Sequence, residues 1–291
     1  MDPLTQALKG ILPPLALAVP ILAAAWRPFG RRPIEDSAVT RGAAPAAIGL
    51  GYLAGHVALT GWPPLAWDVE LKHGLFYLCL LATLLGLLEA RGARPARVGQ
   101  LILSVLVPVY LLDFVRAHRW TTTESVLWST GLALAILAGA ASAEALARRR
   151  EGVSIPLAWT VVGTGAATAL HLSGSTSLGQ LMGAWTSVLG ACVVLAVLRP
   201  RFRLAPGALT ILVLLAGGLL GGLFASELRP ISAILLFLAV FGPWLGELPR
   251  LRDRSGPVGL LTRLLPVLLL SGAAVWIEVV SRPADPYADA R

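Results

Sequence analysis

The sequence predicts an all-α integral membrane protein, a bundle of about ten transmembrane helices, from three observations. The chain has 291 residues, 56% hydrophobic and 14% charged, and its mean hydropathy is +0.74, outside the usual range of soluble globular proteins. Apolar windows of roughly 17 to 25 residues, the length of membrane helices, recur along the whole chain. The run 209–224 is apolar on every face, whereas the strands of a membrane barrel would alternate apolar and polar residues.

The apolar windows account for almost all of residues 1–291, so we expect a single transmembrane domain and no soluble domain. Cys79 and Cys192 fall inside the windows and are interpreted as small buried hydrophobic residues rather than as a disulfide or a thiolate metal site. The expected spans are 7–26, 43–62, 73–90, 98–115, 124–146, 155–173, 177–198, 206–225, 230–248 and 259–280.

The first window is interpreted as a membrane helix rather than a cleaved secretory signal. Its leading segment carries both Asp2 and Lys9 and so has no net positive charge, and four arginines follow the apolar run. A signal peptide has the opposite arrangement, with its positive charge before the apolar region.

Glycines spaced four residues apart mark the second, seventh and eighth windows as packing helices. Without a side chain, the backbones of neighbouring membrane helices can approach closely. We therefore expect these three helices at the centre of the bundle, and favour packing within the chain over dimerisation. The glycines concerned are Gly51, Gly55, Gly179, Gly183, Gly217, Gly218, Gly221 and Gly222.

Two polar segments between windows are predicted to be helix ends rather than ligand sites. Thr121-Thr-Thr-Glu124 has the spacing of a capping box at the start of the fifth window. Ser177-Leu-Gly-Gln180 has a similar spacing at the start of the seventh. Before it, Gly174 is expected to adopt the left-handed conformation that often ends a helix. His171 is expected in the last turn of that helix, where the helix dipole favours a positive charge. The segment 171–180 is therefore interpreted as a helical hairpin, and it contains neither a P-loop lysine nor a nucleophile-elbow motif.

Prolines interrupt several of the apolar windows. Each proline removes a backbone donor and frees a carbonyl. These helices are therefore either simply kinked or broken, as are the helices that line substrate paths in transporters. We favour simple kinks. The positions are Pro13, Pro14 and Pro20 in the first window, Pro108 in the fourth, Pro243 in the ninth and Pro266 in the tenth.

The distribution of arginine predicts the orientation in the membrane. Alternate connections between windows hold sixteen Lys and Arg residues, whereas the other connections and both termini hold seven. Because positive residues accumulate on the cytoplasmic side, both termini are expected outside, in a bacterial cytoplasmic membrane. The net charge of +8 is spread over short loops, so we expect the lipid bilayer and no nucleic acid as a partner.

Ionisable residues in the outer half suggest one candidate site. In the expected topology His56 and His171 lie on two helices that both run outward, and Asp113 and Glu278 lie at similar depth. Such groups could form an outward-facing pocket for a cation, a proton or haem, although solvated polar residues at helix ends explain them equally simply, and we favour that explanation. No motif identifies a cofactor, a metal site or a catalytic residue.

The outer connection 61–72 alternates apolar and charged residues from Leu65 to Lys72. This pattern fits a segment that lies on the membrane surface or against a partner subunit.

In length and helix number the chain is similar to ten-helix drug/metabolite-type permeases. The resemblance covers these two features only, so we assign no functional residues from it. Those permeases usually have cytoplasmic termini, opposite to the expectation here. A small-molecule permease is nevertheless the leading hypothesis for function, because the windows contain prolines and glycines. A non-enzymatic subunit or assembly factor of a membrane complex comes second. An intramembrane enzyme comes third, because few polar residues lie deep in the windows.

Overall fold

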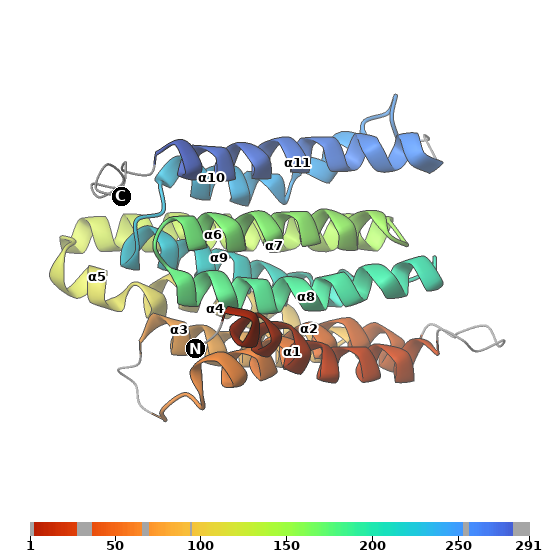
Figure 1. The fold of residues 1–291 in the computed structure, drawn as a ribbon, viewed down its shortest axis with the longest axis horizontal. Helices are drawn as coiled ribbons and strands as arrows, with labels where there is room; N and C mark the ends of the chain where they lie inside the picture. Colours follow the sequence, from red (N-terminus) through yellow and green to blue (C-terminus); the bar gives the residue numbers. More distant parts are fainter. Residues whose placement is uncertain (1–2, 28–36, 66–69, 94, 253–255, 282–291) are drawn as a thin grey trace.

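The computed structural model describes residues 3–27, 37–65, 70–93, 95–252 and 256–281, and these form a bundle of helices that lie mostly along one direction (Figure 1). The described residues contain no strand. The helices are α1 (Pro3–Trp26), α2 (Ala38–Thr60), α3 (Leu71–Ala90), α4 (Pro95–Leu111), α5 (Asp113–His118), α6 (Thr122–Arg149), α7 (Ser154–Leu172), α8 (Thr176–Leu198), α9 (Ala208–Ala225), α10 (Pro230–Ala239) and α11 (Gly256–Val280), with the 3-10 helices η1 (Ala205–Gly207) and η2 (Gly242–Glu247).

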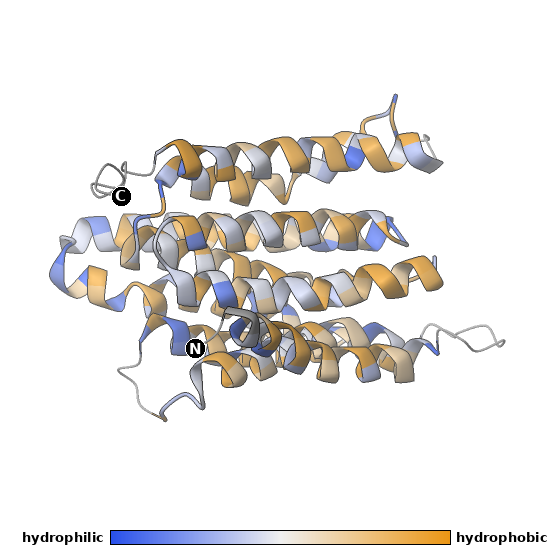
Figure 2. Ribbon diagram, in the orientation of Figure 1, coloured by the Kyte–Doolittle hydropathy of each residue, from blue (hydrophilic) through white to orange (hydrophobic). Residues whose placement is uncertain are grey.

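The predicted fold class, an all-α transmembrane bundle, is confirmed. Nine helical segments in the described part of the chain are long and apolar enough to cross a membrane. Hydrophobic residues predominate along the helices, and most of the strongly hydrophilic ones lie toward the two ends of the bundle (Figure 2). The start of α1 and the end of α11 lie at the same end as α5 (Figure 1). Some residues used to predict orientation and the outer loop lie outside the described residues, namely Arg31, Arg32, 66–69, Arg94, Arg254, Arg282 and Arg291.

The fourth expected window, 98–115, is not one continuous helix. Helix α4 ends at Leu111, and after Leu112 the chain forms the short helix α5. Pro108 lies in the last turn of α4, where it cannot donate a hydrogen bond to the carbonyl of Ser104. The apolar part of α4, Ala96–Leu111, is shorter than the nine long segments.

The ninth window is also divided, because α10 ends at Ala239 and η2 begins at Gly242. Pro243 lies in the first turn of η2, a position where a missing backbone N–H costs little. The other prolines noted in the sequence lie inside continuous helices: Pro13, Pro14 and Pro20 in α1, Pro108 in α4 and Pro266 in α11.

Helix ends match the sequence pattern at one of the two predicted capping boxes. At Thr121 and Glu124 both capping hydrogen bonds are present, so this prediction is confirmed. The prediction for Ser177 and Gln180 is wrong, because α8 begins one residue earlier, at Thr176, without a side-chain cap. Instead, the Gln180 side chain donates a hydrogen bond of 3.1 Å to the Gln6 side chain of α1.

The hairpin between α7 and α8 keeps its other predicted features. Gly174 has a φ of 87°, a left-handed conformation that suits glycine. His171 lies in the last turn of α7. A further capping box joins Ser37 and Thr40 at the start of α2. It was not predicted because its third helical residue is threonine, whereas the usual pattern has Glu or Gln at this position.

The core of the bundle lies around α9. In the most apolar stretch of Ala205–Ala225, 83% of the residues are buried, compared with 22% in α1 and 28% in α11. Gly218 packs against α8, where an added Cβ would lie 2.8 Å from the sulfur of Met182. Gly217 packs against Leu75 of α3. Because glycine has no side chain, Gly217 and Gly218 allow α3 and α8 to pack closely against different sides of α9.

The other predicted packing glycines also lie at helix contacts, with one exception. A Cβ at Gly55 would lie 2.8 Å from the Ala184 Cβ of α8 and 2.8 Å from the Pro14 Cγ of α1. Gly51, Gly179, Gly221 and Gly222 face neighbouring side chains or backbone in the same way. Gly183, in contrast, faces open space within 4 Å.

Candidate functional site: two cavities at opposite ends of α3, α4 and α9

Two histidines form a buried pair between α2 and α3. Nε2 of His56 lies 3.1 Å from Nδ1 of His73, and the exposed fractions of the two residues are 0% and 9%. The rings of Tyr52 and Phe76 pack around His56. The second ring nitrogen of His56, Nδ1, is buried and has no hydrogen-bond partner. The pair therefore shares one donor–acceptor bond, and Nδ1 of His56 is left for a further polar group.

The candidate pocket of four sequence-predicted residues is not assembled by any contact among the described residues. His56 bonds to His73 rather than to His171, and His171 is exposed at the end of α7. Asp113 is exposed at the start of α5 and lies 3.9 Å from the Arg116 side chain. Glu278 is buried in α11 and accepts a 3.1 Å hydrogen bond from the backbone N–H of Arg229. Glu278 thus stabilises the start of α10.

A cavity of about 810 Å³ lies beside α5, and we call it the α5-end cavity. Its wall is built from the start of α3, the end of α4, most of α5 and the end of α9. Its polar side chains are Glu70, Tyr110, Asp113 and His118. Glu70 precedes α3, and the Lys72 ammonium 2.6 Å away lowers the pKa of its carboxyl below the usual range. The α5-end cavity therefore presents carboxylates to a solute.

A second cavity, of about 660 Å³, lies at the opposite ends of the same helices, and we call it the arginine cavity. It is lined by the end of α3, the start of α4 and the segment that leads into α9. Its wall also carries Glu89 and four arginines from different elements: Arg41 of α2, Arg97 of α4, Arg148 of α6 and Arg203 before η1. Arg148 pairs with Glu89 and Glu144, and Arg203 pairs with Glu151. The four guanidinium groups therefore outnumber the three nearby carboxylates, and the cavity keeps a small excess of positive charge.

Glu89 holds part of the arginine cavity in place. Its carboxylate accepts a hydrogen bond of 2.8 Å from Arg148 of α6 and one of 3.0 Å from Gln100 of α4. Arg148 also pairs with Glu144 one turn earlier in α6. Three helices therefore converge on one carboxylate at the edge of the cavity.

Between the two cavities, α3, α4 and α9 pack tightly. From Gly74, which lines the α5-end cavity, to Glu89, which lines the arginine cavity, is about 22 Å along α3. Leu75, Cys79 and Val107 fill this interval and are fully buried. The interval also holds two buried hydroxyls: that of Thr83, which donates to the Cys79 carbonyl, and that of Thr210 in α9, which has no partner. Apolar side chains thus separate the cavities in this conformation.

A buried ion cluster holds η2 against α6 and α11. Both carboxylate oxygens of Glu247 accept hydrogen bonds from Arg150, at 2.7 and 2.9 Å. Arg263 of α11 reaches the same carboxylate at 3.3 Å and is only 6% exposed. A buried arginine requires such a counter-ion, because an unpaired charge in an apolar environment is costly.

Sequence reasoning missed the His56–His73 pair, the arginine cavity and the Glu247 cluster. The signal for the cluster was Arg263, a lone charge within the last apolar window. The arginines of the cavity were recognised only as determinants of orientation. His73 was not among the four residues of the candidate pocket, although it is the partner of His56.

The fold and these cavities define a multi-pass helical membrane protein. No protein-family model, curated protein or solved structure matches the chain. In the described residues no group of three or more His, Cys, Asp or Glu side chains is arranged to hold a metal ion.

Proposed function

We propose that this protein is a small-molecule permease of the bacterial cytoplasmic membrane, with a substrate path along α3, α4 and α9. The observation that carries the proposal is that α3 and α4 line a cavity at each of their two ends, while α9 lines the α5-end cavity and η1, which leads into α9, lines the arginine cavity. The volumes of the two cavities fall within the range of roughly 300–1,000 Å³ that is typical of small-molecule sites. Solute could therefore occupy either end of one continuous helical unit.

Transport would require the apolar contacts between the cavities to separate. Gly74 packs against Tyr110 and Leu111 of α4, and Gly217 packs against Leu75 of α3. Such close contacts between backbones and side chains can slide without a large steric barrier. Pro108, near the end of α4, weakens the hydrogen bonding of the turn that faces the α5-end cavity.

The charge pattern suggests the direction in which the two cavities face. The arginine excess predicts that the arginine cavity opens to the cytoplasm and that both termini lie outside. In that orientation the carboxylates of Glu70 and Asp113 face outward. The arginine cavity favours a small organic substrate that carries an anionic group.

Cysteine accessibility tests this proposal and does not require the substrate to be identified. The native Cys79 and Cys192 are fully buried, so their background reactivity is low. Leu75→Cys places a thiol between the cavities, and Ala158→Cys places one at an equally buried position in α7. A permease that alternates between open states predicts labelling of Leu75→Cys by a membrane-impermeant maleimide, from outside in cells and from inside in inverted vesicles.

The control at Ala158 separates alternating access from general loosening of the bundle. Leu75→Cys should react faster than Ala158→Cys from both sides, with both variants keeping the wild-type melting temperature. Equal and negligible labelling of the two positions would contradict the permease proposal.

A second candidate function is supported by one surface feature. Trp62 and Leu65, in the connection between α2 and α3, are 80% and 98% exposed. Exposed large apolar residues on a loop suit contact with a partner subunit or with the membrane surface. Purification in mild detergent tests this candidate: a stoichiometric partner that is lost from Trp62→Ser would support a subunit of a membrane complex.

A further inference from the structure

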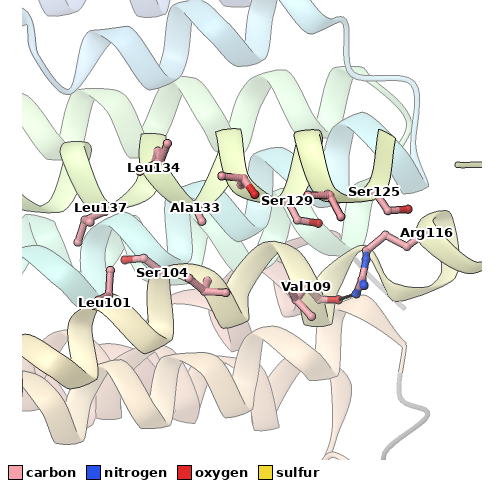
Figure 3. A pocket seen from close by; sticks show the side chains of 12 residues that line it. Leu101, Ser104, Val109, Arg116, Ser125, Ser129, Ala133, Leu134 and Leu137 are labelled. Atoms are coloured by element: carbon pink, nitrogen blue, oxygen red, sulfur yellow. Dashed lines mark hydrogen bonds between the residues drawn. The ribbon is translucent and has the colours of Figure 1, made fainter. Parts of the chain in front are cut away.

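A groove of about 320 Å³ runs between α4 and α6 and shares Val109 with the α5-end cavity. Figure 3 shows Arg116 between the end of α4 and the start of α6, with Ser129, Ala133 and Leu137 pointing from α6 toward α4. Leu101 and Ser104 point toward the groove from α4 (Figure 3). The groove is therefore walled by two helices and has a cation at one end.

From Arg116 along α6 the side chains of the groove change in order. Arg116 lies at the α5 end, followed by the hydroxyls of Ser125 and Ser129, and then by the apolar side chains of Ala133 and Leu137. The Ser104 hydroxyl of α4 lies toward the apolar end and is bonded to the Gln100 carbonyl. From Ser125 to Leu137 the rise along α6 is about 18 Å. Half of a bilayer core is roughly 15 Å thick, so the groove extends over about one leaflet.

Two buried polar atoms in this groove have no partner. They are Nε of Arg116 and the hydroxyl oxygen of Ser129. The Arg116 guanidinium makes a hydrogen bond of 3.2 Å through Nη1 to the Val109 carbonyl and lies 3.9 Å from Asp113. The Asp113 side chain is 75% exposed, so water screens this pair. Unsatisfied buried polar atoms are costly, and an oxygen-rich ligand would satisfy both.

The surroundings of the groove are apolar and exposed. Leu101 and Val105 of α4 are 51% and 47% exposed, and Val126 and Leu134 of α6 are each 60% exposed. In a multi-pass membrane protein such side chains contact lipid, so the groove is accessible from within the bilayer. A ligand that reaches it must be soluble in the membrane.

We propose that this groove binds one anionic phospholipid. The phosphate bonds to the Arg116 guanidinium, the glycerol ester oxygens lie near Ser129, and one acyl chain follows Ala133 and Leu137. A water-soluble anion would use only the Arg116 end, and a lipid without a phosphate would leave the guanidinium without an anion. A phospholipid has its phosphate, ester groups and acyl chain in the same order as Arg116 and the side chains that follow along α6. The site does not depend on the permease proposal.

Native mass spectrometry of the detergent-purified full-length protein tests the site. The probes are phosphatidylglycerol and diacylglycerol with identical acyl chains, of which only the first carries a phosphate. We expect one tightly retained phosphatidylglycerol per chain and a preference of roughly tenfold over diacylglycerol, the effect of one charge-assisted hydrogen bond. Arg116→Gln should abolish the preference.

The matched control is Arg119→Gln. Arg119 lies in the same connection and is exposed, but it does not line the groove. Arg119→Gln should therefore keep the wild-type preference, and Arg116→Lys should keep part of it. Ser129→Leu, which fills the groove, should reduce retention of both lipids, with melting temperatures measured without added lipid to show that the variants fold.

Three results would overturn the proposal. The first is equal binding of the two lipids to wild type, which would indicate annular lipid only. The second is an equal loss of preference in Arg116→Gln and Arg119→Gln, which would indicate a general effect of surface charge. The third is competition by inorganic phosphate at millimolar concentration, which would indicate a site for a free anion rather than a lipid.

Discussion

His56 Nε2 and His73 Nδ1 lie 3.1 Å apart in a buried contact between α2 and α3. The bond requires one ring nitrogen to carry a proton and the other to keep its lone pair, so a pair in which both rings are charged cannot form it. This pairing, and not one between His56 and His171, is the basis of the first prediction.

The stabilities of His56→Ala and His73→Ala should be coupled. Loss of either histidine removes the same hydrogen bond, so the double variant should be less destabilised than the sum of the single variants by about 1 kcal/mol. Thermal melting in detergent of the two single variants and the double variant gives the coupling. The cycle of His56→Ala with His171→Ala serves as the control and should be additive, whereas strong coupling there would support an outward-facing pocket shared by these two histidines.

Glu247→Ala should destabilise the protein strongly. The substitution leaves Arg263 buried without its counter-ion, and breaking a buried ion pair in this way usually costs about 3–5 kcal/mol. Adding Arg263→Met should restore a large part of the stability, because the unpaired charge is then removed. Denaturation in detergent measures both effects.

The control for Glu247 is Glu151→Ala. Glu151 pairs with Arg203, and the side chains of both residues are more than a third exposed, so its loss should cost less than about 1 kcal/mol. Similar losses for Glu247→Ala and Glu151→Ala would mean that water screens the Glu247 cluster.

Gly55→Ala and Gly183→Ala should have opposite effects on stability. A Cβ at position 55 would meet Ala184 and Pro14 at 2.8 Å, and overpacking of this kind costs about 1–3 kcal/mol. At position 183 a Cβ meets nothing within 4 Å, so the higher helix propensity of alanine should stabilise by up to about 1 kcal/mol. Equal melting temperatures for the two variants would show that α2 and α8 pack less closely than these distances require.

Fusion reporters should show the arginine-rich end of the bundle in the cytoplasm. A reporter that is active only in the cytoplasm should be active after Arg150 or Arg203 and inactive after Arg291, because sixteen of the Lys and Arg residues lie on one side. Activity after Arg291 would reverse the orientation. The arginine cavity would then open outward, and the α5-end cavity would face the cytoplasm.

The sequence alone predicted the features that depend on local chemistry or on composition. Long apolar windows can form only helices in a membrane, since every backbone polar group must be satisfied within its own segment. The capping box at Thr121 and Glu124 requires only residues three positions apart, and it is present. Gly174 has the left-handed backbone expected after α7.

Tertiary structure decided which side chains meet, because the choice of partner depends on how each helix is rotated and packed. Gln180 had the spacing for a local cap, yet its amide bonds to Gln6, which is 174 residues away. Arg263 was visible as an isolated charge, but its counter-ion Glu247 lies on a different element. The arginines of the second cavity are far apart in sequence and converge only when α2, α4, α6 and the segment before η1 pack together. Sequence spacing determines neighbours within one helix, whereas neighbours on different helices are determined by the shapes of all the surfaces in contact.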